Sequence, residues 1–148
     1  MRLSLQVRYA ICGVFDLAYN GSGTLIRIQD ISDRQAIPAR YLEQIFQRLR
    51  RARIVTSKRG PGGGYSLARE AGEITIREIL EAVEAPIERA LLPEADEETS
   101  GFRPDFLWLD LAARISGALD AVTIDDVCRA ATEAQVESAE GEGPMYFI

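Results

Sequence analysis

Apolar residues recur with the spacing of amphipathic helices over much of the first half of the chain. Between residues 5 and 19 they stand at i, i+3, i+4 and i+7, namely at Ile11, Val14, Phe15 and Ala18, which predicts a helix with one buried face. The turn residues at 20–23 then end it. A second, short helix is predicted over residues 28–35. Pro38 fits the first turn of a third helix, where its missing N–H costs nothing.

The third predicted helix separates apolar from polar residues most clearly. Its apolar positions repeat the helical spacing at Leu42, Ile45, Phe46 and Leu49. The other side carries guanidinium, amide and carboxylate groups, which pair with base edges and phosphates in DNA. These residues are Arg40, Glu43, Gln44, Gln47 and Arg51. One face can therefore pack while the other contacts DNA, and an ordinary amphipathic surface helix is the alternative.

Two short strand-like runs, residues 54–57 and 65–68, flank the sequence KRGPGGG. They predict a β-hairpin whose tip spans residues 58–64. Three helices followed by a hairpin with a cationic tip describe a winged helix-turn-helix, in which the third helix enters the major groove and the wing follows the backbone or a minor groove. Gly62, Gly63 and Gly64 would permit positive φ and close approach to DNA. A phosphate-binding P-loop is the rival interpretation, but Tyr65 follows the last glycine where that motif needs Lys.

Helical spacing continues in the second half of the chain. Thr75 with Glu78 forms a predicted capping box, and the helix after it has an apolar face. Further on, apolar residues recur at spacings of 3, 4, 3 and 4, the seam of a helix that packs lengthwise on another. The seam residues are Trp108, Leu111, Ile115, Ala118 and Val122. A dimerisation helix is predicted, and a seam buried inside one protomer is the alternative.

Length and charge place these elements in context. A chain of 148 residues is the size of one domain, or of one small domain with an oligomerising appendage. It has no continuous apolar run of membrane-spanning length and no secretory signal, so we expect a cytoplasmic protein without membrane contact. The net charge of −6 averages +7 over residues 1–70, from 12 Lys and Arg against 5 Asp and Glu, and −13 over residues 71–148, from 5 against 18. This asymmetry predicts a basic module that meets a polyanion and an acidic module that does not.

Three stretches carry a resemblance to a known family: RYA near the start, RYLEQIFQRLRRARIV in the third helix and RGPGGGYSLAR in the wing. They resemble the Rrf-type family of bacterial transcriptional regulators, and the likeness extends over about residues 1–131. It implies a homodimeric winged-helix repressor or activator on a palindromic promoter site, with Arg40, Glu43, Gln44 and Arg50 at the major groove and Ser57 and Arg59 at the wing. The complete predicted DNA-binding set is Arg40, Tyr41, Glu43, Gln44, Gln47, Arg50, Arg51, Ser57, Lys58, Arg59, Gly60, Gly62, Gly63 and Gly64.

The predicted fold is mainly α with a small β-hairpin. The expected parts are a winged helix-turn-helix domain over residues 1–84, an acidic sensory-type loop over 85–105, the dimerisation and C-terminal helices over 106–134, and a tail over 135–148. Members of the family that the chain resembles usually carry glycine at the position of Ala36 and a capping Ser at the position of Pro38. If that turn is left-handed, the alanine costs about 1 kcal/mol, and proline offers no oxygen to cap the helix.

Cysteine content sets this chain apart from the cluster-binding branch of the family. The loop before the predicted dimerisation helix resembles a segment that carries three cysteines in that branch. Residues 86–105 contain none, and carboxylates are hard donors that suit other ions than an iron–sulfur cluster. We therefore expect no cofactor and no metal, with a cluster on unusual ligands as the alternative. Cys128 falls on an apolar helix face, which favours a structural role. Cys12, beside Arg8, is the candidate for redox chemistry.

Two further expectations concern partners. The chain has no histidine and no matched nucleophile and base, so an enzyme is not expected. The acidic run at 94–98 is a candidate contact for an effector or partner protein, and a protein-interaction module is the alternative to a DNA-binding regulator. The apolar end of the tail, residues 145–148, is a weaker candidate for docking on a partner chain.

Overall fold

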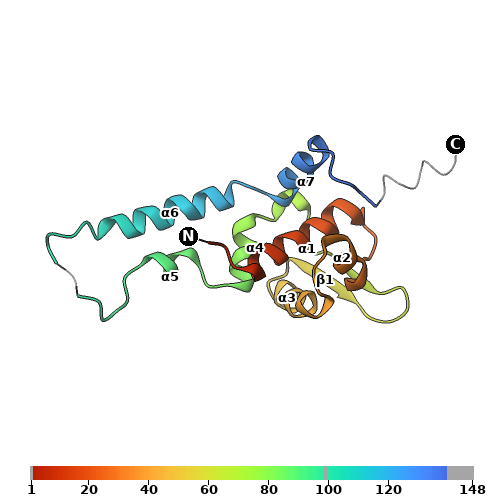
Figure 1. Cartoon of the computed structure of the whole chain (residues 1–148), viewed down its shortest axis with the longest axis horizontal. Helices are drawn as coiled ribbons and strands as arrows, with labels where there is room; N and C mark the ends of the chain where they lie inside the picture. The colour runs from red at the N-terminus through yellow and green to blue at the C-terminus, as the bar shows by residue number, and fades with distance from the viewer. Residues whose placement is uncertain (1, 99, 140–148) are drawn as a thin grey trace.

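Three helices of the first half enclose a shared apolar core in the computed structural model, which describes residues 2–98 and 100–139. They are α1 (Leu5–Gly21), α2 (Ile28–Gln35) and α3 (Ala39–Arg51). Their apolar faces meet, and several side chains are fully buried there: Val7, Val14, Ile31, Leu42, Phe46 and Leu49. The helices predicted from the apolar spacing are confirmed (Figure 1). The tail residues 145–148 lie outside the described residues.

The turn between α2 and α3 shows the local consequence of two unusual residues. Ala36 adopts the left-handed conformation, with φ of 54°. The cost of about 1 kcal/mol expected for an alanine in a left-handed turn therefore applies. Pro38 is the N-cap of α3 and makes no side-chain capping bond. It therefore precedes the first turn in which it was expected, because its own backbone is extended rather than helical.

The hairpin consists of β1 (Val55–Lys58) and β2 (Gly64–Leu67), paired antiparallel with Val55 opposite Leu67. The first strand starts one residue later than predicted, because the N–H of Ile54 is bonded to the carbonyl of Leu49 at the end of α3. Ile26 adds a single bridge to the other side of β2, with two backbone bonds of 2.9 and 2.7 Å to Tyr65. A bridge formed by a single residue produces no alternation of apolar and polar positions in the sequence, so this bridge was not predicted.

The second half begins with the 3-10 turn η1 (Ala71–Glu73) and the helix α4 (Ile76–Val83), whose predicted capping box between Thr75 and Glu78 is confirmed. A short helix, α5 (Ile87–Leu91), lies in the segment predicted to be a loop. The long helix α6 (Phe106–Asp120) and α7 (Ile124–Glu133) follow. Val122 lies beyond the end of α6, where its carbonyl accepts from the N–H of Ile76. Its prediction as part of the helical seam is therefore wrong.

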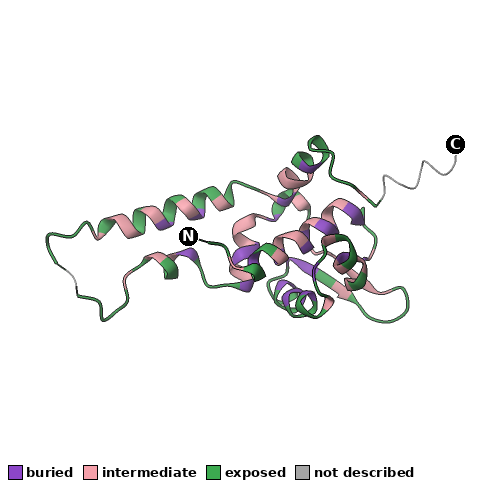
Figure 2. Cartoon of the chain, in the orientation of Figure 1, coloured by how far each residue is buried: buried purple, intermediate pink, exposed green. Residues whose placement is uncertain are grey.

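Two regions of the molecule differ in how they are packed. We call residues 2–84 and 122–139 the body, and residues 85–121, from the end of α4 through α5 and α6, the arm. The arm projects from one side of the body (Figure 1). Buried residues gather in the body, whereas the arm is mostly half-buried or exposed (Figure 2). Among the described residues, no helix has the length and apolar character to cross a membrane.

Candidate nucleic-acid interface

The polar face of α3 is exposed over its whole length. Arg40, Tyr41, Glu43, Gln44, Gln47, Arg50 and Arg51 are all exposed, while the four apolar residues between them are buried. The guanidinium of Arg40 lies 5.7 Å from the centroid of the Tyr41 ring, which restrains both side chains. The structure therefore brings every predicted contact of α3 onto one accessible surface.

The tip of the wing depends on its glycines in two different ways. Gly60 and Gly62 have φ of 92° and 74°, the left-handed region that glycine enters without steric cost. A Cβ on Gly63 would collide with the carbonyl oxygen of Lys58, and one on Gly64 would lie 2.6 Å from that of Ile26. The glycine cluster is thus required by the hairpin itself, and it leaves Lys58 and Arg59 exposed at the tip.

A side-chain hydrogen bond joins α3 to the wing. The guanidinium of Arg50 donates to the hydroxyl of Ser57 at 3.2 Å, so two predicted DNA contacts from different elements touch each other. Arg50, Arg53 and Arg69 line an open pocket with Thr56 and Ser57. Arg69 is already occupied by Glu78 and two backbone carbonyls.

Most cations of this surface have no acidic partner. Among the described residues, no ion pair involves Arg40, Arg50, Arg51, Arg53, Lys58 or Arg59. Unneutralised charge on one surface raises the local concentration of a polyanion and supplies phosphate contacts. The electrostatics of α3 and the wing therefore suit DNA.

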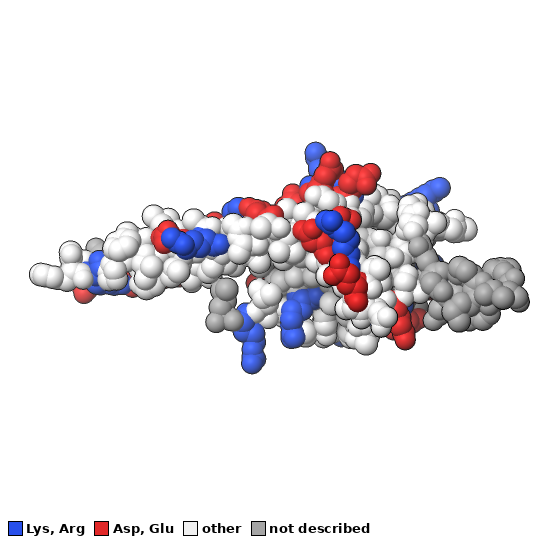
Figure 3. Space-filling view, turned by 90° about the horizontal axis from the view of Figure 1, so that it is seen from above, with Lys and Arg blue, Asp and Glu red and all other residues white. Residues whose placement is uncertain are grey.

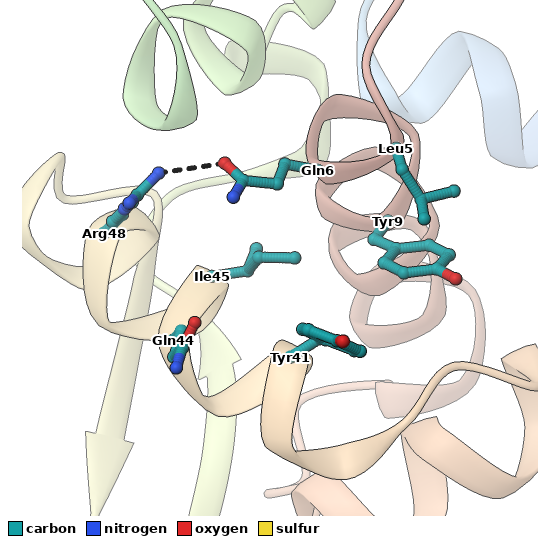
Figure 4. A pocket seen from close by; sticks show the side chains of 7 residues that line it. All are labelled: Leu5, Gln6, Tyr9, Tyr41, Gln44, Ile45 and Arg48. Carbon is teal, nitrogen blue, oxygen red and sulfur yellow. Dashed lines mark hydrogen bonds between the residues drawn. The ribbon is translucent and has the colours of Figure 1, made fainter.

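Arg48 is the exception among the cations of α3. Its Nη1 donates to the side-chain oxygen of Gln6 on α1 and to the carbonyl of Val83 at the end of α4, both at 3.0 Å. Beside it, α1 and α3 enclose a mainly apolar pocket of about 200 Å³ (Figure 4). The lining residues are Leu5, Gln6, Tyr9, Tyr41, Gln44, Ile45 and Arg48. This contact between α1 and α3 was not predicted from the sequence, since residues 6 and 48 lie far apart in it.

A buried carboxylate fixes α2 against α1. Asp16 is fully buried and accepts from Arg34 at 2.7 and 3.0 Å, from Gln35 at 2.9 Å and from Asn20 at 3.2 Å. Its hydrogen bond with Arg34 raises the pKa of that guanidinium. Because a buried charge is tolerated only when it is paired and hydrogen-bonded, this cluster specifies the angle at which the helix-turn-helix is held.

Both thiols lie in the body and pack partly buried against the core. Burial raises the pKa of Cys12, although Arg8 lowers it in part. Burial raises the pKa of Cys128 to about 11, with the charge of Asp125 adding to the effect. No group of three potential metal ligands occurs among residues 2–98 and 100–139.

One side of α6 packs inside the protomer, and the predicted dimer seam lies along the edge of that side. Trp108, Leu111 and Ile115 are half-buried within the protomer, while Ala118 is exposed. The large apolar side chains that α6 leaves most exposed are Phe106, at 76%, and Leu109, at 62%. The seam spacing alone did not single these two residues out, because they fall on a neighbouring stripe of the same helix.

Comparison with known proteins agrees with this architecture. The model of the Rrf2 family, described as an iron-dependent transcriptional regulator, matches residues 3–130. The HTH-type transcriptional regulator IscR of Photobacterium profundum is 38% identical over 131 residues, which cover 87% of this chain and 76% of that protein.

Solved structures show the same fold. IscR of T. potens has a TM-score of 0.75 and 29% identity, covering 99% of this chain and 96% of that one. CymR of B. subtilis, described as the global cysteine regulator, has a TM-score of 0.73 and 27% identity, covering 88% and 98%. The resemblance noted in the sequence is confirmed, and the chain belongs to the Rrf2 family of DNA-binding transcriptional regulators.

Proposed function

We propose that the protein is a homodimeric regulator that recognises a palindromic promoter site through α3 and the wing. The observation that carries this is the surface of exposed cations and amides without acidic partners on these two elements. A two-fold dimer presents two such surfaces to successive turns of DNA, which matches a palindrome. Phosphate contacts supply most of the affinity, and base contacts from Arg40, Glu43, Gln44 and Arg59 supply the sequence preference.

The residues present do not fit an iron–sulfur cluster of the three-cysteine kind. The two cysteines stand on α1 and α7 of the body, and the loop between α5 and α6 has none. Their raised pKa values work against the thiolate form in which cysteine binds iron. We therefore propose that the regulator acts without such a cluster, although its family is described as iron-dependent.

The dimer contact that we propose uses the arm. Its exposed apolar residues Phe106 and Leu109, with Ala113 on the same side of α6, form a surface that a lone protomer leaves in water. Seen from above, uncharged atoms cover most of the length of the arm (Figure 3). A second copy would bury this surface and supply the hydrophobic free energy of association.

The test is selection of binding sites from random duplex DNA, followed by measurement of affinity for the recovered site and for scrambled DNA. We expect a palindrome, with an affinity that falls steeply as salt is raised. Arg59→Ala should relax the preference at the position contacted by the wing by about tenfold. If this variant lost affinity equally for all DNA, Arg59 would be a phosphate contact. Recovery of no common sequence would refute the proposed function.

A further inference from the structure

We propose that Arg77 determines the spacing at which the two halves of a promoter site are bound, because it fixes the angle between the arm and the body. The inference rests on the homodimer and the palindrome proposed above. It assigns a positioning role to a group of charged side chains at the junction of the two regions, where α4, α5 and the end of α6 meet. None of these side chains belongs to the surface formed by α3 and the wing.

Arg77 connects the body to the arm. Its guanidinium lies 3.4 Å from the carboxylate of Glu88 on α5 and 2.8 Å from that of Asp120 at the end of α6. Among residues 2–98 and 100–139, every other ion pair lies within the body or within the arm. One cation of α4 therefore contacts both helices of the arm, which run side by side (Figure 1).

The guanidinium of Arg77 makes this connection with a fixed geometry. Each of its nitrogens donates to a different carboxylate: Nε to Glu81 at 3.0 Å, Nη1 to Asp120 at 2.8 Å and Nη2 to Glu88 at 3.4 Å. Because a guanidinium is planar and presents its donors as a rigid fork, the three helices are held in one relative orientation. Hydrogen bonds with Asp120 and Glu81 raise the pKa of Arg77, so the side chain stays charged at the pH of any binding assay.

The position of Glu88 depends on this contact. Its Oε1 accepts from Arg77 and, at 3.2 Å, from the hydroxyl of Ser116, a buried residue of α6. Its Oε2 is buried and has no hydrogen-bond partner among the described residues. A carboxylate with one unpaired oxygen that also loses its cation is driven toward water. The side chain of Glu88 is 35% exposed and can turn outward, which would release α5 from α4 and α6.

The other contacts at the junction treat the two helices of the arm differently. Beyond the end of α6, residues 122–124 form backbone hydrogen bonds of 2.9 Å with residues 74–76. By contrast, α5 meets the body through the buried Ile87 and the half-buried Leu91. Burial of apolar surface is non-directional, so these two residues keep α5 attached without fixing its angle. The charged group at Arg77 supplies the direction.

The angle of the arm matters because each body carries one α3 and one wing. When two arms pair about a two-fold axis, the angle between each arm and its body sets the separation of the two DNA-binding surfaces. One base pair between the half-sites changes their separation by about 3.4 Å and their relative rotation by about a tenth of a turn. A small rotation at the junction therefore changes which spacing is bound.

The test is the affinity for duplexes in which the gap between the selected half-sites is lengthened or shortened by one or two base pairs, beside a duplex with a single half-site. Wild-type protein should prefer one spacing. Arg77→Met removes the donors, so it should reduce the preference for that spacing over its neighbours by about tenfold and leave binding of the single half-site unchanged. The matched control is Arg129→Met, since the ion pairs of Arg129 lie within α7; it should keep the wild-type preference.

A second variant tests the same contact on the side of the arm. Glu88→Gln keeps an acceptor for Ser116 and removes the charge that Arg77 binds. It should change the spacing preference in the same direction as Arg77→Met. Because the side chain of Glu88 is partly exposed, this variant keeps the test available even where Arg77→Met lowers the yield of folded protein.

The angle itself can be measured by the distance between two spin labels in one protomer. The labels are attached at Ala90→Cys on α5 and Ala130→Cys on α7, two exposed positions, in a Cys12→Ser, Cys128→Ala background. An excess of unlabelled protein leaves only distances within one protomer. We expect a narrow distance distribution that broadens in Arg77→Met and stays narrow in Arg129→Met.

The outcomes separate this inference from the proposed function. If the wild-type chain binds a palindrome as a dimer but Arg77→Met keeps both the spacing preference and the narrow distance distribution, the role of Arg77 is refuted and the proposed function stands. Equal loss of affinity for the single half-site and for every spacing would also refute it, since Arg77 would then support the body rather than the angle. If the wild-type chain is monomeric or binds no palindrome, both proposals fail.

Discussion

The body and the arm use their side chains in different ways. In the body, apolar residues are buried and the one fully buried carboxylate has four hydrogen bonds. In the arm, Phe102, Phe106 and Leu109 are exposed, and residues 86–105 carry a run of acids. The body buries its apolar side chains within the protomer, whereas the exposed apolar residues of the arm are the surface that we propose a second copy buries. Substitutions in the body should therefore lower the free energy of unfolding, and those in the arm should weaken association.

The largest effect is expected from Asp16→Ala in the body. It removes the fully buried acceptor shared by Arg34, Gln35 and Asn20, and it leaves the buried amide of Asn20 and the half-buried one of Gln35 without this partner. Breaking a buried pair costs about 3 kcal/mol, at the low end of the usual range because Arg34 remains partly exposed. Denaturant unfolding measures it, with Asp33→Ala as the matched control on an exposed acid. A loss equal to that of the control would mean that Asp16 does not hold the helices together.

The next largest effect is expected in the rate at which the thiol of Cys128 reacts with an alkylating reagent. Because burial raises its pKa from 9.0 to about 11, the folded protein at pH 8 holds about one hundredth of the ordinary thiolate fraction. Alkylation by iodoacetamide, followed by mass spectrometry, should therefore be about a hundredfold slower than in urea-unfolded protein. Equal rates in the two states would contradict a structural role and reopen redox chemistry in the body.

In the arm, Leu109→Asp should weaken dimerisation by more than about tenfold, since it places a charge on the apolar surface proposed to be buried. Its unfolding free energy should change little, because Leu109 is exposed in the protomer. Sedimentation equilibrium measures the first quantity and denaturant unfolding the second. The control, Ala130→Asp on an exposed position of α7, should leave association unchanged. A dimer that tolerates Leu109→Asp would place the contact elsewhere.

The smallest effect concerns the junction between the two regions at the start of α4, where the hydroxyl of Thr75 also donates to Asp120 of the arm. Thr75→Ala removes the side-chain half of the capping box of α4, at a cost of about 1 kcal/mol in unfolding free energy. Thr132→Ala, on an exposed hydroxyl near the end of α7, should cost less than half of that. If both variants unfolded alike, the capping box would not contribute to the stability of the junction.

Local spacing was enough to predict the helices of the body, the hairpin and the polar face of α3, because each depends on residues within a few turns of one another. The contacts that hold these elements together were not predictable in the same way. The bond from Arg48 to Gln6 joins residues 42 positions apart, and the cluster at Asp16 draws on two helices. The positive φ predicted for the wing is confirmed at Gly62. Gly63 and Gly64 have a further reason inside the hairpin, where an added Cβ would meet the carbonyl oxygens of Lys58 and Ile26.

In the arm, spacing predicted the long helix α6, and which side of it meets a second copy stays a prediction. Trp108 and Ile115 fit the seam pattern, yet both are half-buried inside the protomer. Periodicity reports that a face is apolar, and it does not distinguish burial against α5 from burial against a second copy. The end of α6 was missed for a similar reason, since Val122 fits the spacing but lies where the chain bonds back to Ile76.

The most direct test of the central claim is the DNA affinity of protein purified without oxygen, measured before and after removal of iron by a chelator. Fluorescence anisotropy would compare the selected palindrome with scrambled DNA of the same composition. We predict the same tight, sequence-dependent binding in both preparations, because we propose that α3 and the wing form the interface and that the regulator acts without a cluster. Sequence preference that appears only in iron-containing protein would contradict the account.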